Sequence, residues 1–513
     1  MNIEEITADL HTEVQRTATE THCPSIAWAV AHHGQITHHG FARGADVARD
    51  PDVARGVDVA RGADVASGAG FARGADVASG ADGVDGAGDE FDGDERTRVY
   101  RIASMTKSFT AATVLALCDD GLLHLDDPIA SLAPEFAAIR HPAPDAPEIT
   151  VRHLLSMTAG LATDDAWADR HLDFTDADLD NVYARGATFA VKTGTEFEYS
   201  NLGYAMLGRI IHRVTGQRPQ EVTSERVLRP LALLNTTWTP PTDTPWAPAF
   251  RVQDGVNLPE PPPLGDGGLA PMGGLWSNLN DLATWTNWLS EAFSGGGEDA
   301  TIVRRASRRQ MQTTQTYRFL DHRPASGPEA ASVAISEGYG FGLCVDHDDR
   351  HGLVIHHTGG LPGYGSNMRW LPARGLAIIA LANVTYARME ALTMRLLDRL
   401  GDLGAIPDAP SLEWPELERA GRGLVELLNG WTDSRANKLF ADNVELDESF
   451  ERRAAAARRL VDLHGSLQYS AVRASWATSG VVVAQGTNGS TVEIDVELTP
   501  QVPPLVQLYA TRT

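Results

Sequence analysis

The 513-residue sequence predicts an α+β protein, because three features of its apolar pattern combine helices with antiparallel strands. Between residues 99 and 403, runs with helical spacing are mixed with strand-like runs such as Gly375 to Asn383. A proline-rich segment, residues 404–416, then predicts a linker. Beyond it, a helical stretch is followed by alternating strands on both sides of Asn488-Gly489, a strong hairpin signal. Residues 417–513 are therefore predicted to form a small α+β domain.

Residues 1–403 are expected to form one larger domain, which opens with a helix and a hairpin. Apolar residues recur at helical spacing between residues 2 and 21. The segment from Ser25 to Phe41 predicts two strands joined by a turn that contains Gly34. Further helices are predicted over Phe109 to Cys118, Tyr204 to Val214 and Leu279 to Leu289.

A repeated hexad, RGADVA with variations, interrupts this domain over residues 43–97. Its period resembles that of left-handed β-helices, which need several coils of about three hexads each to bury a core. The repeat here supplies about two coils, with alanine as the main inward residue. The glycines of calcium-binding repeats are also missing. We therefore expect a flexible surface insertion rather than a folded module.

The charge balance and the cysteines exclude several classes of protein. Asp and Glu (68) outnumber Lys and Arg (43), and the resulting net charge of −25 repels nucleic acid. No uninterrupted apolar run of about 18 residues is present, so we expect no membrane span. The acidic start, MNIEEITADL, differs from a secretory signal, and Cys23, Cys118 and Cys344 form no CxxC pair. These features predict a cytoplasmic protein without a disulfide framework.

Lysine is scarce, since only Lys107, Lys192 and Lys438 occur. An acidic excess with few lysines is typical of a salt-rich cytosol, where screening removes the self-repulsion of the surface. A GC-rich genome that favours Arg and Ala explains the same composition. A halophilic origin therefore stays one of two interpretations.

The first candidate for chemistry is Ser104-Met105-Thr106-Lys107, at the start of a predicted helix. Lys107 lies one helical turn after Ser104, on the same face. A serine hydroxyl becomes a good nucleophile when a neighbour removes its proton, which an amine with a lowered pKa can do. Taken alone, the same spacing is explained as well by a serine that caps the helix and a lysine that is solvated.

Two further motifs carry groups with matching chemistry. Tyr199-Ser200-Asn201 combines a tyrosine that can move a proton with an amide that can bind substrate. Its plainer interpretation is a packed tyrosine that caps the following helix, with Asn201 satisfying backbone N–H groups there. His357-Thr358-Gly359-Gly360 follows a predicted strand, Leu353 to His356. Glycines after a strand let a substrate lie along the backbone, and they leave backbone N–H groups free to bind an oxyanion. The plainer interpretation of this segment is an ordinary turn.

Together and in this order, the three motifs resemble those of serine β-lactamases and penicillin-binding proteins, and more closely the class C β-lactamase-related esterases and peptidases. The resemblance covers roughly residues 5–400 and includes ITVRHLLSMTAGL, PMGGLWSNLNDLATW and HHTGGLPGYGSNMRWLP. It implies a β-lactamase-like fold, in which an all-helical subdomain packs against an antiparallel sheet flanked by helices. The active site would lie between them, and the C-terminal domain would be an addition.

The resemblance implies that Ser104 is the acylated nucleophile and Lys107 its proton partner. Tyr199 would be the base for acylation and the acid toward the leaving group.

The same resemblance implies how substrate is held. Asn201 would hydrogen-bond the substrate carbonyl or amide, with Thr358 and Gly359 lining the binding strand. The backbone N–H groups of Ser104 and Gly360 would form the oxyanion hole.

His357 departs from the pattern of penicillin-recognising enzymes, which carry lysine at this catalytic position. A cation there recognises the carboxylate of a β-lactam or of a peptide terminus, and a largely neutral imidazole does so less well. The departure favours an esterase or a D-amino-acid peptidase.

The sequence therefore predicts a cofactor-free serine hydrolase for a small ester, amide or peptide, of the esterase or D-aminopeptidase kind. A β-lactamase or D,D-peptidase on the same residues is the alternative, and a non-catalytic binding protein on this scaffold is a third. No nucleic-acid or membrane partner is predicted. The C-terminal domain would cover the cleft or mediate a homo-oligomer.

Two other groups of residues are expected to be structural. The first hairpin carries several histidines, which fit exposed positions better than a metal site: His32, His33, His38 and His39. We predict no metal ligands. Three tryptophans are expected in the core rather than in the cleft: Trp276, Trp285 and Trp370.

Overall fold

The computed structural model describes residues 2–44, 93–261, 263–294, 302–324, 332–409 and 414–512. The hexad repeat predicted as an insertion lies almost entirely outside the described residues. The chain divides into two compact units, Met1–Pro407 and Asp408–Thr513, which are described separately. Among the described residues, no helix is long and apolar enough to cross a membrane.

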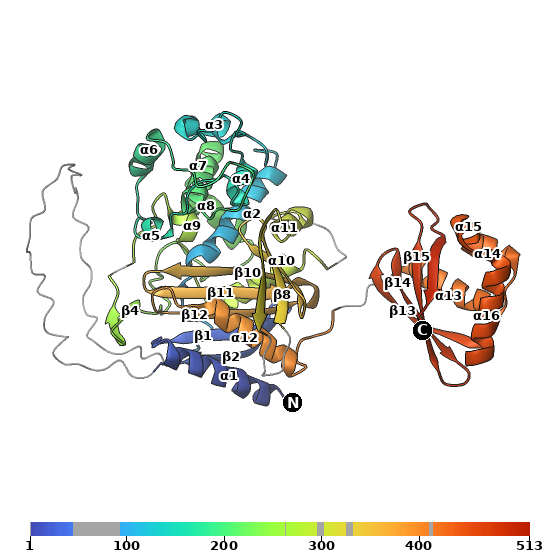
Figure 1. Ribbon diagram of the computed structural model, residues 1–513. Coiled ribbons are helices and arrows are strands. Elements are labelled where there is room, and N and C mark those ends of the chain that lie inside the picture. Colours follow the sequence, from blue (N-terminus) through green and yellow to red (C-terminus); the bar gives the residue numbers. More distant parts are fainter. Residues whose placement is uncertain are drawn as a thin grey trace, which may run out of the picture. The chain divides into compact units, whose positions relative to one another are not determined.

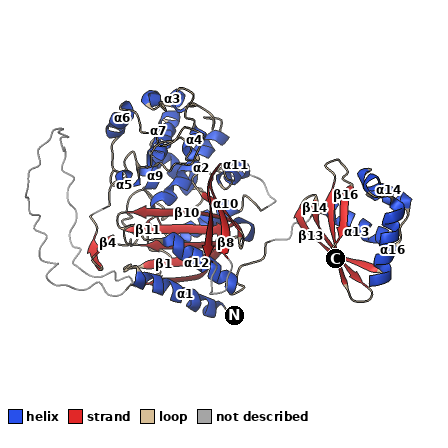
Figure 2. Ribbon diagram, in the orientation of Figure 1, coloured by secondary structure: helices blue, strands red, loops and turns tan. Residues whose placement is uncertain are grey.

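The first unit is built around an eight-stranded antiparallel sheet with the order β2-β1-β12-β11-β10-β9-β8-β7 (Figures 1 and 2). The predicted N-terminal hairpin is confirmed as its first two strands, and Gly34 lies in the turn with a φ of +76°. The strands are β1 Ile26–His32, β2 Gln35–Ala42, β7 Thr316–Pro324, β8 Ser332–Tyr339, β9 Cys344–Asp348, β10 Gly352–Leu361, β11 Tyr364–Leu371 and β12 Leu376–Ala382.

Helices cover both faces of this sheet. On one face lie α1, Ile3–Glu20, and α12, Met389–Asp402, and on the other lies α10, Leu279–Ser290. Strand β12 shows why its sequence is apolar throughout. Ile378 packs with the α1 and α12 side chains, whereas Ile379 packs with those of α10, so successive residues are buried on opposite faces. The helix predicted over residues 2–21 is confirmed as α1, which begins with a capping box of Asn2 and Glu5.

A helical subdomain lies beside the sheet (Figure 1). Two of its predicted helices are confirmed as α2, Thr106–Asp119, and α7, Asn201–Thr215. Its other helical segments are α3 Ile129–Leu132, η3 Pro134–Ala138, α4 Val151–Leu155, α5 Asp165–Ala168, α6 Asp176–Ala184, α8 Pro219–Thr223, η4 Ser224–Leu228 and α9 Ala270–Gly273. The remaining elements of the unit are α11 Arg305–Met311, η5 Pro372–Arg374 and the two-stranded pairs β3 Tyr100–Arg101 with β6 Trp276–Ser277 and β4 Phe250–Gln253 with β5 Val256–Pro259.

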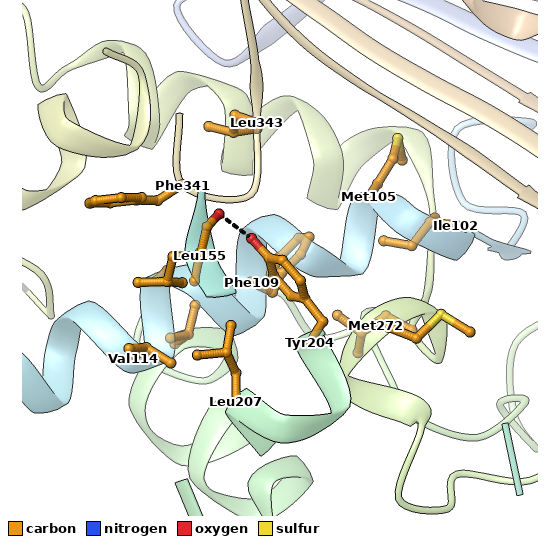
Figure 3. Close-up of a cluster of buried hydrophobic side chains, with 14 of the residues drawn as sticks. Ile102, Met105, Phe109, Val114, Leu155, Tyr204, Leu207, Met272, Phe341 and Leu343 are labelled. Carbon is orange, nitrogen blue, oxygen red and sulfur yellow. Dashed lines mark hydrogen bonds between the residues drawn. The ribbon is translucent and has the colours of Figure 1, made fainter. Parts of the chain in front are cut away.

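The core of the subdomain surrounds α2, whose residues from Thr106 to Leu117 are all buried. Figure 3 shows Phe109 on this helix among side chains from α7 and α9, and the Tyr204 hydroxyl donating to the Leu155 carbonyl at 2.9 Å. Because α2 is buried all round, it holds the residues at its first turn in fixed positions.

The second unit combines four helices with a four-stranded antiparallel sheet in the order β13-β14-β15-β16. The expectation that Val492, Ile494, Val496 and Leu498 face one way is confirmed, since all four are buried. The elements are α13 Pro415–Asn429, α14 Asp433–Leu439, α15 Asn443–Asp447, α16 Phe450–His464, β13 Leu467–Trp476, β14 Ser479–Gly486, β15 Thr491–Leu498 and β16 Val506–Thr511.

Candidate active site

Ser104 lies in a short 3-10 turn, η2, Ala103–Met105, which leads directly into α2. The preceding residue, Ala103, has a φ of +49°, in the left-handed region that is unfavourable for a residue with a Cβ. Such strain persists only where surrounding contacts impose it. The serine is 8% exposed, so its hydroxyl is held at the floor of a cleft by a rigid turn.

Strand β10 passes so close to this turn that only glycine fits at position 359. A Cβ there would lie 2.2 Å from the Ile102 carbonyl oxygen and 2.3 Å from Ser366 Oγ. Ser366 itself donates to the Ile102 carbonyl at 2.8 Å. The glycine predicted in the binding strand therefore fixes the distance between that strand and the nucleophile.

Replacing Gly359 by Ala is expected to destabilise the unit by about 1–3 kcal/mol and to lower activity, because the backbone carbonyl of Ile102 must move. Thermal unfolding and hydrolysis rates would measure both effects. Gly203→Ala is the control, since a Cβ there meets its nearest neighbour, Leu154, at an ordinary 3.6 Å. Equal behaviour of the two variants would contradict this account.

Lys107 is fully buried, and its side-chain nitrogen is surrounded by polar partners. Nζ donates to Ser104 Oγ at 3.0 Å, to Asn201 Oδ1 at 2.7 Å and to the Met272 carbonyl at 2.8 Å. It also lies 4.8 Å from the centre of the Tyr199 ring. The structure thus brings the first two motifs together and excludes a solvated lysine.

Burial lowers the pKa of Lys107 to about 8, although nearby carboxylates, foremost Asp165, act in the opposite direction. With such a pKa, part of the population holds a neutral amine at neutral pH. A neutral amine at hydrogen-bond distance from Ser104 Oγ can accept the hydroxyl proton.

Asn201 is also fully buried, and its side chain connects Lys107 to the start of α5. Its Nδ2 donates to Asp165 Oδ1 at 2.6 Å, while its Oδ1 accepts from Lys107. Ser200, not Asn201, caps helix α7, by accepting from the Gly203 N–H at 3.2 Å. The simpler interpretation of Asn201 as a helix cap is therefore wrong, and its amide is available to orient Lys107.

Tyr199 is half-buried and lines the same cleft as Ser104 and His357. Burial raises the pKa of its hydroxyl well above the usual value, and the negative charge of Asp165 adds to this, whereas a hydrogen bond with Ser104 acts against it. The phenol therefore keeps its proton at neutral pH.

The third motif lies inside a strand, not after one. The predicted strand Leu353 to His356 continues as β10 to Leu361, and residues 355–361 pair with β11. On the opposite side, β9 pairs only with residues 352–356 of β10. In the described part of the chain, the β9 side of residues 357–361 is left unpaired, as an added substrate strand requires.

His357 occupies this strand as a buried, neutral imidazole. Its Nε2 lies 3.2 Å from the Tyr339 hydroxyl and its Nδ1 lies 2.7 Å from the Thr358 carbonyl oxygen. Burial, reinforced by the charge of Lys107, lowers the pKa of His357 to about 3. The imidazole therefore carries no charge with which to bind a substrate carboxylate.

The motif residues meet in a cleft of about 550 Å³, whose lining includes Ser104, Tyr199, His357, Thr358 and Gly360. Lys107, Asn201 and Gly359 support this surface from behind rather than line it. The cleft also contains Cys344 and a set of charged and aromatic residues that the motifs did not reveal, namely Asp165, Asp169, Phe197, Arg318, Phe319, Glu337, Tyr339, His356, Tyr386 and Glu390. No local pattern marks them, because each reaches the cleft through long-range folding.

One of these unpredicted groups joins distant parts of the chain. The Tyr386 hydroxyl donates to Asp169 Oδ2 at 2.9 Å, across 217 residues of sequence. Burial raises the pKa of Asp169 to about 7. The ring of Tyr386 also lies close enough to Gly360 to contact a Cβ there at 2.9 Å.

The residues expected to be structural lie away from this cleft. Trp276, Trp285 and Trp370 are buried in the core. In the first hairpin, His38 lies 2.8 Å from Thr7 Oγ1 and His39 lies 2.6 Å from Glu95 Oε1, so the two rings contact different partners.

Two bacterial proteins show what this chain is similar to in sequence. Protein flp of Staphylococcus aureus strain MW2 is 25% identical over 305 residues, which is 58% of this chain and 56% of that protein. The D-alanyl-D-alanine-carboxypeptidase/endopeptidase AmpH of Escherichia coli strain K12 is 24% identical over 310 residues, 60% of this chain and 76% of AmpH. The chain thus spans little more than half the length of protein flp.

Two solved structures show the same fold. A D-stereospecific amidohydrolase from Streptomyces sp. matches with a TM-score of 0.51 and 20% identity, covering 75% of this chain and 97% of that one. An octameric penicillin-binding protein homologue from Pyrococcus abyssi matches with a TM-score of 0.55 and 18% identity, covering 98% and 95%. The family model described as beta-lactamase matches residues 10–402. The chain belongs to the beta-lactamase family.

Proposed function

We propose that this protein is a serine hydrolase that cleaves esters or small amides and peptides through an acyl-enzyme on Ser104, in the manner of an esterase or a D-aminopeptidase. The observation that carries the proposal is the fully buried amine of Lys107, 3.0 Å from the Ser104 hydroxyl at the floor of a cleft. Burying an amine costs free energy because its charged form loses hydration. Here the buried amine is a proton acceptor placed beside a nucleophile.

Acylation begins with transfer of the Ser104 proton to neutral Lys107, while Oγ forms a bond to the substrate carbonyl carbon. The carbonyl oxygen becomes an oxyanion, held by the N–H groups of Ser104 and Gly360. When the tetrahedral species collapses, the bond to the leaving group breaks and Tyr199 supplies the proton. The proton on Lys107 then restores the tyrosine, and water attacks the acyl-enzyme in the second half of the reaction.

This scheme gives Lys107, rather than Tyr199, the role of base in acylation. Sequence resemblance assigned that role to the tyrosine, but burial raises the pKa of Tyr199 and lowers that of Lys107 to about 8. At neutral pH the amine is the more accessible base and the phenol the better acid.

The neutral state of His357 favours this substrate class over β-lactams and peptides with a free carboxylate terminus. A D,D-peptidase remains the second candidate, because the relative AmpH is named for that activity.

Intact-mass spectrometry after brief exposure to p-nitrophenyl acetate, and separately to a penicillin, tests the proposal. We expect nitrophenol release with a transient acetyl adduct on Ser104 and no lasting penicilloyl adduct. Ser104→Ala should show neither adduct nor turnover while unfolding at the parent temperature. A penicilloyl adduct or rapid ring opening would instead support the β-lactam class. Turnover retained by Ser104→Ala, or no adduct with either probe, would overturn the acyl-enzyme proposal.

A further inference from the structure

The cleft carries carboxylates close to His357. An enzyme that binds a substrate carboxylate needs cations there instead. Glu390, in the first turn of α12, accepts from the Thr358 hydroxyl at 3.2 Å, and its side chain is 45% exposed. Thr358 is the residue next to His357 in the binding strand. A second carboxylate, Glu337, lies in the same region beside Arg318 at 3.3 Å.

Two basic side chains lie against Glu390, and of these His356 lines the cleft whereas Arg369 does not. The side chains of Arg369 and His356 are each 3% exposed, and each approaches Glu390 Oε1 to 3.9 Å. Among the described residues, Arg369 Nε and Nη2 and His356 Nδ1 are buried without a hydrogen-bond partner. The other ring nitrogen of His356, Nε2, lies 2.8 Å from Asp346 Oδ2. Glu390 is therefore a cleft-lining carboxylate that lies within 3.9 Å of both side chains.

The charge of Glu390 is stable at neutral pH. Burial alone would raise the pKa of Glu390, but the neighbouring His356 and Arg369 side chains and the Thr358 hydroxyl outweigh it and hold the pKa below its usual value. A substrate carboxylate that entered this region would therefore meet a carboxylate first.

We assign this region to the leaving group, because Tyr199, the proposed donor of the leaving-group proton, lines the same cleft as Glu390. Phe197, two residues before Tyr199 in the chain, lines this cleft together with Tyr339 and Glu390. The Phe197 and Tyr339 rings lie 5.4 Å apart, and the Arg318 guanidinium lies 4.7 Å from the Phe197 ring. Gly360, two residues after Thr358, instead faces Tyr386, whose hydroxyl donates to Asp169.

Resting on the serine-hydrolase function proposed above, we propose that Glu390 determines specificity by supplying, from within the chain, the carboxylate that pairs with the buried Arg369 and His356. The site thereby rejects leaving groups that carry a carboxylate and accepts neutral or cationic ones. The substrate class is an acyl ester or amide whose leaving portion has no free carboxylate, with preference for one that carries an ammonium group.

Three acetyl thioesters that differ only in leaving-group charge test this directly: those of thioglycolate (anionic), thioglycolamide (neutral) and thiocholine (cationic). Thiol release is followed with a chromogenic disulfide. We expect kcat/KM of the wild-type protein to rise in that order, and the spread to narrow as added salt screens the charges. Equal rates for the anionic and neutral thioesters would overturn the proposal without any variant.

Glu390→Gln keeps the shape of the side chain and removes its charge. It is expected to raise the thioglycolate-to-thioglycolamide ratio of kcat/KM about tenfold, since one repulsive charge is lost beside the cationic Arg369 side chain. Glu20→Gln, at the end of α1 with a side chain 56% exposed, removes the same charge away from the cleft-lining residues and should leave the ratio unchanged. If Glu390→Gln still hydrolyses the neutral thioester but does not raise the thioglycolate-to-thioglycolamide ratio, this inference alone is overturned. No hydrolysis of any thioester, with no acetyl group on Ser104, would overturn the serine-hydrolase function and this inference with it.

Discussion

Replacing Lys107 by Met is expected to lower kcat/KM for p-nitrophenyl acetate by a factor of about 10³ or more, because the nucleophile loses its proton acceptor. Methionine fills a similar volume in the buried position but carries no group that can replace Nζ. The transient acetyl adduct on Ser104 should disappear from the intact-mass spectrum as well. An adduct formed at the parent rate would show that Lys107 takes no part in acylation.

The pH dependence of the parent enzyme supplies an independent measurement of the same role. Only neutral Lys107 accepts a proton, so with a pKa of about 8, kcat/KM should rise roughly tenfold per pH unit below pH 8 and level off above it. His357 cannot produce this rise, since its pKa is about 3. Asp169, with a pKa of about 7, is an alternative titrating group among the cleft carboxyl groups.

Asp169→Asn separates the two groups. The Asp169 carboxylate raises the pKa of Lys107, so its removal should move the rise in kcat/KM to lower pH without abolishing it. If the pH dependence instead vanishes in Asp169→Asn, the titrating group is Asp169 and the assignment of Lys107 is wrong.

The sequence predicted those parts of the fold and site that depend on local order. Strand β12 and helix α2 were evident from their apolar runs, and the three motifs stood in a recognisable order. The residues Ser104, Lys107 and Asn201 do meet, with Lys107 Nζ bonded to both of the others. The contact between Ser104 and Lys107 could be predicted from local spacing, since one helical turn separates them. The contact of Lys107 with Asn201 could be predicted only from the family resemblance.

The charged lining of the cleft could not be predicted in the same way. Glu390 is one of many acidic residues in a chain of net charge −25, and it matters because α12 places it against Thr358, 32 residues earlier. The strand that carries Thr358 was also predicted too short. Its glycines suggested that the strand ends at His356, whereas the close approach to Ile102 requires glycine inside the strand.

Replacing Tyr199 by Phe is expected to lower kcat/KM for an amide substrate by a factor of about 10²–10³, but to affect p-nitrophenyl acetate far less. An amide nitrogen must be protonated as it leaves, whereas nitrophenolate leaves as a stable anion. Because burial keeps the proton on Tyr199, the substitution removes an acid and not a base. The ratio of amide to ester rates, measured with the same acyl group, isolates this step.

Tyr183→Phe is the matched control for the loss of a buried hydroxyl. Tyr183 lies in α6, and its hydroxyl has no hydrogen-bond partner among the described residues, so its removal should leave the ratio of amide to ester rates at the parent value. Equal losses on amide and ester in Tyr199→Phe would mean that the tyrosine acts before the leaving group departs, as the base in acylation. A fall confined to the amide assigns Tyr199 the leaving-group proton and leaves Lys107 as the base, which the opposite pKa shifts of these two buried groups predict.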